Sequence, residues 1–135
     1  MSLSTNTILL YSIVGAVILT YAPFLVVGLA RVKVGYDMSA PRAMFDKLPD
    51  YARRATWAHQ NGFEALIIYS AAALMAYVTG VDSQWAAIAA IVFLIARLFY
   101  SVFYIANIAV LRSMMFAIGS LSGWTLFVLS LLQVT

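Results

Sequence analysis

The chain contains no cysteine and few charged residues. Without cysteine it can form neither a disulfide framework nor a thiolate metal site, so any thiol in its chemistry must come from a substrate. Charged residues are 10% of the 135, against about 25% in ordinary soluble domains, and 64% are hydrophobic. These proportions exclude an ordinary soluble domain and indicate a single integral membrane domain over residues 1–135.

Basic residues are also too few for a nucleic-acid-binding surface. The formal net charge is +3, and the charges cluster between apolar segments, as membrane topology requires. The one histidine, His59, has no second histidine with which to share a metal, and we predict no metal site. The first apolar segment has no basic residue before it and no small-residue cleavage site after it, which favours a retained helix.

Four apolar segments are each long enough to cross a hydrocarbon core of about 30 Å. They cover about residues 6–30, 54–78, 84–110 and 114–134. The fold class that this pattern predicts is all-α, an integral membrane four-helix up-and-down bundle.

The segments between these spans carry turn signals. Residues 31–53 form a polar loop, with a short interfacial helix expected at residues 41–48 because proline is favoured in a first helical turn. The second helix is expected to begin near Pro49 or Asp50. We place tight turns at residues 79–83 and 111–113.

The distribution of Lys and Arg predicts the orientation in the membrane. Six of the eight lie between the first two spans and Arg112 lies between the last two, whereas the amino terminus and residues 79–83 have none. Both basic loops should therefore be cytoplasmic, with both termini outside.

Two polar stripes follow the second and third spans. Helical spacing of three and four places Trp57, Asn61 and Glu64 on one face, with Arg54 and Gln60 near its edges. In the third span the same spacing aligns the residues Arg97, Ser101, Tyr104, Ile108 and Arg112, with Tyr100 beside them.

The two stripes should meet. If the helices are antiparallel about Gly80, residues whose numbers sum to about 161 lie at equal depth, which pairs Glu64 with Arg97. The same rule pairs Asn61 with Tyr100, Gln60 with Ser101, and Trp57 with Tyr104. We predict an intramembrane ion pair between Glu64 and Arg97, or at least a shared polar pocket, because pairing offsets the desolvation of each charge. The alternative is that the pair only fixes helix register.

The neighbouring side chains favour a binding site. Amide, phenol and guanidinium groups of Asn61, Tyr100, Tyr104, Arg112 and Arg54 run from mid-membrane toward the cytoplasmic surface. Guanidinium groups clamp carboxylates and an amide can bind a peptide bond, so this lining suits a small anionic, peptide-like ligand. His59 lies off this face and is read as an interfacial residue, and Gly119 and Gly123 as close helix packing.

These motifs resemble a known family. Ala-His-Gln-Asn-Gly-Phe-Glu (58–64), Ala-Arg-Leu-Phe-Tyr-Ser-Val-Phe-Tyr (96–104) and Leu-Arg-Ser (111–113) are similar to the MAPEG family, the membrane-associated proteins in eicosanoid and glutathione metabolism. The resemblance covers nearly the whole chain. It is strongest to bacterial members of the microsomal glutathione transferase type, which implies a bacterial inner-membrane location.

The resemblance implies a homotrimer with glutathione held between neighbouring subunits and open toward the cytoplasm. Asn61 and Glu64 would bind the glutathione peptide, Tyr100 and Tyr104 would line the site, and Arg112 would stabilise the thiolate. Arg31, at the end of the first span, would be a further candidate for a glutathione carboxylate. Many eicosanoid-pathway members have arginine where this chain has Trp57, and Arg53 or Arg54, one turn away, is the expected substitute.

Three functions remain open at this point. The first is a glutathione-dependent transferase or peroxidase that acts on lipophilic electrophiles or lipid hydroperoxides in the membrane. The second is a non-catalytic membrane scaffold or lipid-binding relative. The tryptophan at position 57, in place of an expected carboxylate-binding arginine, favours it. The third is a small proton-coupled exporter, which is disfavoured if Arg97 neutralises Glu64.

Overall fold

The computed structural model describes residues 3–135, and in them it forms four long α-helices and one short 3-10 helix, with no strand. The elements are α1 (Thr5–Lys33), η1 (Pro41–Lys47), α2 (Asp50–Val78), α3 (Gln84–Ile105) and α4 (Ala109–Val134). All four α-helices are long and apolar enough to cross a membrane. The predicted all-α architecture with four spans is confirmed, and α2 begins at Asp50, as expected.

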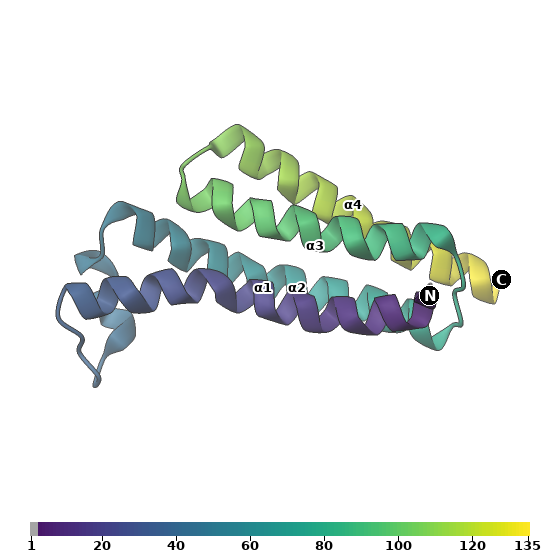
Figure 1. Ribbon diagram of the computed structural model, residues 1–135, viewed down its shortest axis with the longest axis horizontal. Helices are drawn as coiled ribbons and strands as arrows, with labels where there is room; N and C mark the ends of the chain where they lie inside the picture. Colours follow the sequence, from purple (N-terminus) through teal and green to yellow (C-terminus); the bar gives the residue numbers. More distant parts are fainter. Residues whose placement is uncertain (1–2) are drawn as a thin grey trace.

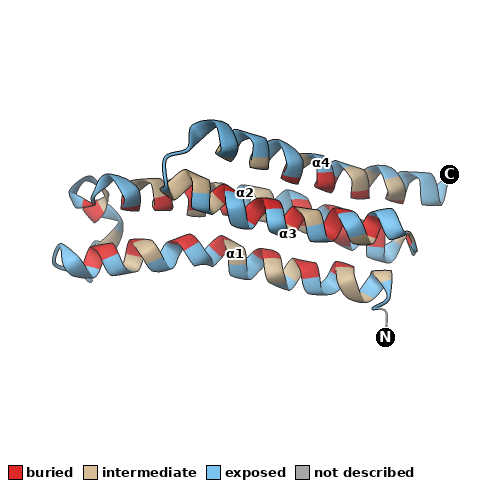
Figure 2. Cartoon of the chain, turned by 45° about the horizontal axis from the view of Figure 1, so that its top comes forward, coloured by how far each residue is buried: buried red, intermediate tan, exposed pale blue. Residues whose placement is uncertain are grey.

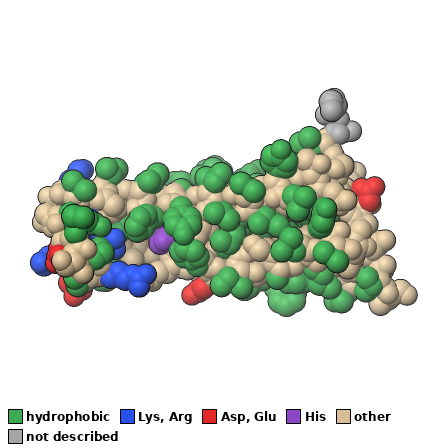
Figure 3. All heavy atoms as spheres, turned by 90° about the horizontal axis from the view of Figure 1, so that it is seen from below, with side chains coloured by type: hydrophobic (Ala, Val, Ile, Leu, Met, Phe, Trp, Pro, Cys, Tyr) green, Lys and Arg blue, Asp and Glu red, His purple; other side chains and the backbone are tan. Residues whose placement is uncertain are grey.

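The four helices run side by side and alternate in direction, as Figure 1 shows. Both chain ends and the α2–α3 turn lie at one end of the bundle, whereas η1 and the α3–α4 turn lie at the other (Figure 1). We call the end that holds η1 the basic end, because Lys and Arg side chains gather there (Figure 3). The opposite end carries no Lys or Arg in its α2–α3 turn.

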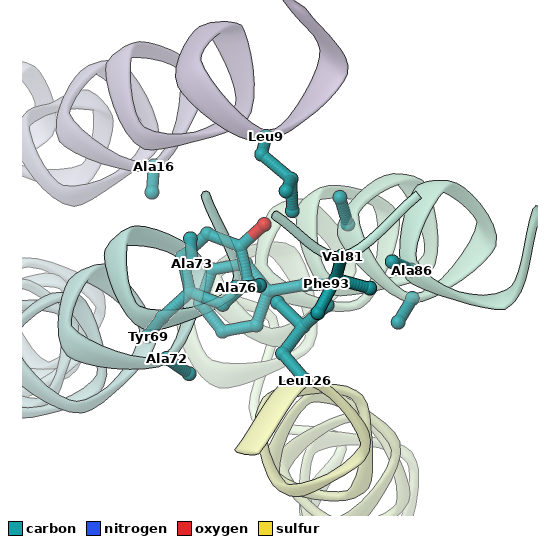
Figure 4. Close-up of a cluster of buried hydrophobic side chains, with 12 residues drawn as sticks. Leu9, Ala16, Tyr69, Ala72, Ala73, Ala76, Val81, Ala86, Phe93 and Leu126 are labelled. Carbon is teal, nitrogen blue, oxygen red and sulfur yellow. The ribbon is translucent and has the colours of Figure 1, made fainter. Parts of the chain in front are cut away.

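Buried and exposed residues alternate along each helix, as Figure 2 shows. Many of the buried residues are alanines, whereas many large apolar residues are exposed. In the largest core cluster Tyr69 of α2 stacks on Phe93 of α3, with ring centroids 3.7 Å apart (Figure 4). The Tyr69 hydroxyl lies 2.6 Å from the Ser12 hydroxyl of α1, so its polar atom is satisfied within the core. Leu25, Ile67 and Val110 are each about 70% exposed, as expected of surfaces that face lipid.

Helix α2 ends at a glycine, as the turn signal predicts. Gly80 has φ of +73°, a left-handed conformation that glycine adopts without steric cost. The Gly80 and Val81 amides donate to the carbonyls of Tyr77 and Ala76, which is the Schellman pattern of helix termination.

Helix α3 ends five residues earlier than predicted. The expected third span, residues 84–110, is wrong at its end, because α3 stops at Ile105 and α4 begins at Ala109. Asn107 has φ of +62°, and the amides of Asn107 and Ile108 donate to Tyr104 and Phe103 in the same Schellman pattern. The turn predicted at residues 111–113 is therefore wrong too, and Arg112 lies in the first turn of α4.

Candidate functional site

A hydrogen-bonded chain of three polar side chains joins α2 to α3 in the middle of the bundle. Arg97 is only 6% exposed, and its Nη1 donates to Asn61 Oδ1 over 3.0 Å. Asn61 in turn donates from Nδ2 to Glu64 Oε2 over 3.2 Å. The amide therefore links the buried cation to the acid.

The predicted direct ion pair between Glu64 and Arg97 is wrong. In residues 3–135 the one ion pair within 4.0 Å joins Arg53 to Asp50, at 2.7 Å. Asn61 lies one turn nearer the basic end and takes the Arg97 donor, while the Glu64 side chain stays exposed. The weaker form of the prediction is confirmed, since Asn61, Glu64 and Arg97 line one cavity of about 160 Å³.

Two tyrosines in contact with each other, and an arginine against each of them, extend this chain to the basic end. The guanidinium carbon of Arg97 lies 4.0 Å from the Tyr100 ring centroid, and that of Arg112 lies 4.7 Å from the Tyr104 ring centroid. The two tyrosine rings meet edge to face at 5.6 Å. Cation–π contacts of this kind stabilise each cation while leaving the edge of its guanidinium open to hydrogen bonding.

We call the six residues Asn61, Glu64, Arg97, Tyr100, Tyr104 and Arg112 the polar ladder. It brings together six of the eight side chains that the sequence nominated. The arrangement offers an amide, a carboxylate, two phenols and two guanidinium groups, and such groups can bind the amide, carboxylate and ammonium groups of a peptide.

The depth rule holds for one outer pair and fails for another. Trp57 lies 6.5 Å from Tyr104 between ring centroids, as predicted. Gln60 and Ser101 do not meet, because Gln60 lines a cavity between α1 and α2, and Ser101 lines one between α1 and α3. Equal depth gives no information about direction around the helix, and both residues face α1.

The α4 side of the 160 Å³ cavity was missed by the sequence reasoning. Phe116, Ser120 and Trp124 line it at successive spacings of four, together with the two glycines of α4. A Cβ on Gly119 would lie 3.7 Å from both Ala96 Cβ and Arg97 Cδ, which fits its predicted packing role. A Cβ on Gly123 would meet nothing within 4 Å, so this glycine borders open space. The helical spacing of these α4 residues was the available signal.

Arg53 and Arg54, the expected substitutes for an arginine at position 57, both have partners within the chain. Arg53 pairs with Asp50, and Arg54 donates from Nε to the Ile105 carbonyl over 3.0 Å, which caps the end of α3. Trp57 itself packs against Phe45 of η1, with ring centroids 5.7 Å apart. The Ile105 carbonyl would therefore compete with a ligand for the Arg54 guanidinium.

Arg31 lies apart from the polar ladder. It lines a cavity of about 590 Å³ bounded by α1, η1 and the face of α2 that carries His59 and Gln60. His59 donates from Nδ1 to the Thr20 carbonyl over 2.6 Å and packs beside Phe24 and Phe63. Within one chain, the predicted site residues therefore lie on two sides of α2: Arg31 on the side of His59, and the polar ladder on the side of Asn61.

The described residues 3–135 contain no group of three or more His, Cys, Asp or Glu side chains placed to hold a metal ion.

Comparison with known proteins agrees with this arrangement. The model of the MAPEG family matches residues 8–132, a range that includes all of α2 and α3 and the whole polar ladder. The comparison with curated proteins and the comparison with solved structures give no match. Since the family match covers nearly the whole chain, this protein belongs to the MAPEG family.

Proposed function

We propose that the protein is a glutathione-dependent transferase or peroxidase that acts on lipophilic electrophiles or lipid hydroperoxides in the membrane. Family membership supports the coarser statement, that of a membrane protein of glutathione and eicosanoid metabolism. The observation that carries the finer proposal is the polar ladder, which runs from the middle of the bundle at Arg97 to the basic end at Arg112.

In this proposal glutathione lies along the ladder. The exposed carboxylate of Glu64 accepts from a donor of the peptide, and the Asn61 amide binds a peptide group. Tyr100 and Tyr104 form the wall between these residues and Arg112. Three copies assemble as a homotrimer, and a neighbouring copy closes the open side of the site.

Arg112 activates the thiol. A free thiol ionises near pH 8.5, and a guanidinium within hydrogen-bonding distance favours the thiolate, which is the nucleophile. Stacking on Tyr104 positions the Arg112 guanidinium, and its place in the first turn of α4 adds the positive end of the helix dipole. The sulfur then bonds to the electrophilic carbon as the leaving group departs, with no covalent protein intermediate.

The lipophilic partner enters from the bilayer. The cavity beside Asn61 and Arg97 is otherwise mostly apolar, with Ile68 and Phe93 on its wall. Asn61, Glu64 and Arg97 line this cavity, so a partner held there lies beside the ladder residues that bind the peptide. Holding both reactants in one site lowers the barrier by converting a bimolecular step into an effectively unimolecular one.

Conjugation of glutathione to chlorodinitrobenzene by the purified protein tests the proposal. We expect Arg112→Ala to lower kcat about tenfold or more near pH 7, and the loss to shrink above the thiol's own pKa of about 8.5, where ionisation no longer needs the arginine. Arg53→Ala, which removes a partly exposed arginine paired with Asp50, is the control. Full activity of Arg112→Ala near pH 7 would remove Arg112 from this role.

A second candidate is a non-catalytic scaffold that keeps the fold. Trp57 favours it, because tryptophan stands where an arginine clamp is expected and both Arg53 and Arg54 already have other partners. Calorimetric titration separates the two functions, since a scaffold need not bind glutathione.

We also propose that the basic end faces the cytoplasm of a bacterial inner membrane, with both termini outside. The cysteine-free sequence makes this easy to test. Ala43→Cys, exposed on η1, should be protected from an impermeant maleimide in intact cells, whereas Gln84→Cys, exposed at the opposite end, should be labelled. The reverse labelling pattern would mean that the basic end faces outward and that both termini are cytoplasmic.

A further inference from the structure

The cavity of about 160 Å³ beside Arg97 is lined mainly by aromatic and small side chains. It lies between α2, α3 and α4, and four aromatic residues border it: Tyr69, Phe93, Phe116 and Trp124. Its other polar lining residues are Asn61, Glu64 and Arg97 of the polar ladder, with Ser120 of α4. This lining suits a ligand with an aromatic ring, because aromatic rings attract one another edge to face or offset.

The two ends of the cavity differ in character. Asn61 and Arg97 border the end nearer the basic end of the bundle, since α2 runs away from the basic end and α3 runs toward it (Figure 1). Tyr69 and Phe93 border the end that lies further from it. A ligand in the cavity therefore meets hydrogen-bonding groups at one end and an aromatic stack at the other.

The stack of Tyr69 on Phe93 closes the far end of the cavity. The two ring planes lie 6° from parallel, with the centroids 3.7 Å apart. The core beyond the stack is closely packed, and Ala73, Ala76 and Leu126 have no exposed surface there (Figure 4). A ligand cannot extend past Tyr69 without displacing this core.

A hydrogen bond from α1 holds the Tyr69 ring in place. The Ser12 hydroxyl donates to the Leu9 carbonyl over 2.7 Å, so the Tyr69 hydroxyl, 2.6 Å away, donates to the Ser12 oxygen. Tyr69 is thus fixed by a hydrogen bond to α1 and by stacking on α3.

The volume of the cavity limits what it can hold. A dry cavity of about 150 Å³ in another protein binds benzene, whereas sites for drug-sized ligands usually have about 300–1,000 Å³. At about 160 Å³, this cavity holds one aromatic ring with small substituents. A lipid hydroperoxide carries its reactive group within a long chain, and the closed end at Tyr69 leaves no room for the chain on that side.

We propose that the lipophilic partner of this site is a compact electrophile with a single aromatic ring, and that Tyr69 sets this limit. The inference rests on the proposed function, which places the lipophilic partner in this cavity. It favours conjugation of aromatic electrophiles over reduction of long-chain hydroperoxides. Ser12 is a positioning residue for this limit, because it acts through Tyr69.

Quenching of Trp124 fluorescence by nitroaromatic compounds tests the size limit in the absence of glutathione. Nitrobenzene, 1-nitronaphthalene and 9-nitroanthracene form a rigid series of increasing size. In neutral-detergent micelles, nitrobenzene should quench saturably, and 9-nitroanthracene should bind about tenfold or more weakly after correction for partition into the micelles, because it overfills the cavity. Trp124→Phe should remove the saturable part, since Trp57 and Trp85 lie outside the lining.

Two glycines give a matched pair of variants. Gly123 borders the cavity, and a Cβ there would meet nothing within 4 Å. Gly123→Leu should therefore fill the cavity and weaken nitrobenzene binding about tenfold or more. Gly28 of α1 has equally open surroundings but lies outside the lining, so Gly28→Leu should leave the binding unchanged.

Changes at Tyr69 and Ser12 test what sets the limit. Tyr69→Ala removes the ring that closes the cavity, so 9-nitroanthracene should bind about tenfold or more tightly than it does to the wild-type protein. Ser12→Ala frees the ring and should give a smaller gain, and it carries the test if Tyr69→Ala does not fold. Ser12→Thr keeps a hydroxyl and should retain the wild-type ratio of the two affinities.

The proposal would be overturned if nitrobenzene did not quench saturably, or if 9-nitroanthracene bound the wild-type protein as tightly as nitrobenzene does. Unchanged nitrobenzene binding in Gly123→Leu, or an unchanged affinity ratio in both Tyr69→Ala and Ser12→Ala, would overturn it too. Selective binding of the single ring, without conjugation of glutathione to chlorodinitrobenzene, would support the size limit and contradict the proposed function.

Discussion

Two arginines of this bundle are buried to a similar extent but differ in their partners. Arg97 is 6% exposed, donates to Asn61 and stacks on Tyr100. Arg31 is 9% exposed, and its Nε has no partner among the described residues 3–135. The Nε of Arg53 also lacks a partner, but the Arg53 side chain is 37% exposed and pairs with Asp50. Burial together with an incomplete set of partners therefore distinguishes Arg31 from the other two arginines.

The comparison also separates the two faces of α2. The face with Asn61 and Glu64 meets α3 and α4 and carries the polar ladder, whereas the face with His59 and Gln60 meets α1 and η1. On the first face, Arg97 has an acceptor in Asn61 and a stacking partner in Tyr100. On the second, the Nε of Arg31 has no partner among the described residues.

The largest expected effect is on stability, from replacing each buried arginine by methionine. Arg97→Met should cost about 2 kcal/mol, because the Asn61 acceptor loses a charged donor. Arg31→Met should lower the stability by less than about 1 kcal/mol, or raise it. The substitution removes a nitrogen that has no hydrogen-bond partner and keeps an apolar stem of similar length. Unfolding in neutral detergent without anionic lipid measures both, and equal losses would erase the distinction between the two arginines.

A smaller effect concerns which residue is coupled to Arg97. A double-mutant cycle with Asn61→Ala should give a coupling of about 1–2 kcal/mol, since the two side chains share a hydrogen bond. The cycle with Glu64→Gln should give less than about 1 kcal/mol, because no direct contact within 4.0 Å joins Glu64 to Arg97. A larger coupling of Arg97 to Glu64 than to Asn61 would show that the direct ion pair forms after all.

The smallest effect should come from a third arginine, Arg53, which is partly exposed and paired. Arg53 lies 2.7 Å from Asp50, but the two side chains are 37% and 78% exposed. Arg53→Gln should therefore cost less than about 1 kcal/mol, and added salt should reduce the cost further. A loss as large as that of Arg97→Met would mean that burial does not control the value of these contacts.

The sequence predicted the four spans because long apolar segments have few alternatives in a membrane protein. It predicted the end of α2, since Gly80 is a strong signal for a left-handed residue. It missed the end of α3, because Asn107 adopts the same conformation but lies inside an apolar segment, where it reads as an ordinary polar residue.

The candidate site was predictable only in part, for a geometric reason. Helical spacing and matched depth found the residues of the ladder, but they could not decide that Asn61 rather than Glu64 takes the Arg97 donor. That choice depends on side-chain reach, which differs between two residues one turn apart. Likewise, no spacing rule within α1 indicates that Arg31 faces a different cavity from the ladder.

Isothermal titration of glutathione into the purified protein tests the central claim most directly, namely that the polar ladder binds the thiol peptide. The wild-type protein should show saturable binding, and Asn61→Ala should weaken it about tenfold or more by removing an amide contact. Asn6→Ala, the same change in an exposed residue near the start of α1, should leave the binding unchanged. Absence of saturable binding to the wild-type protein, or equal binding by Asn61→Ala, would contradict the account.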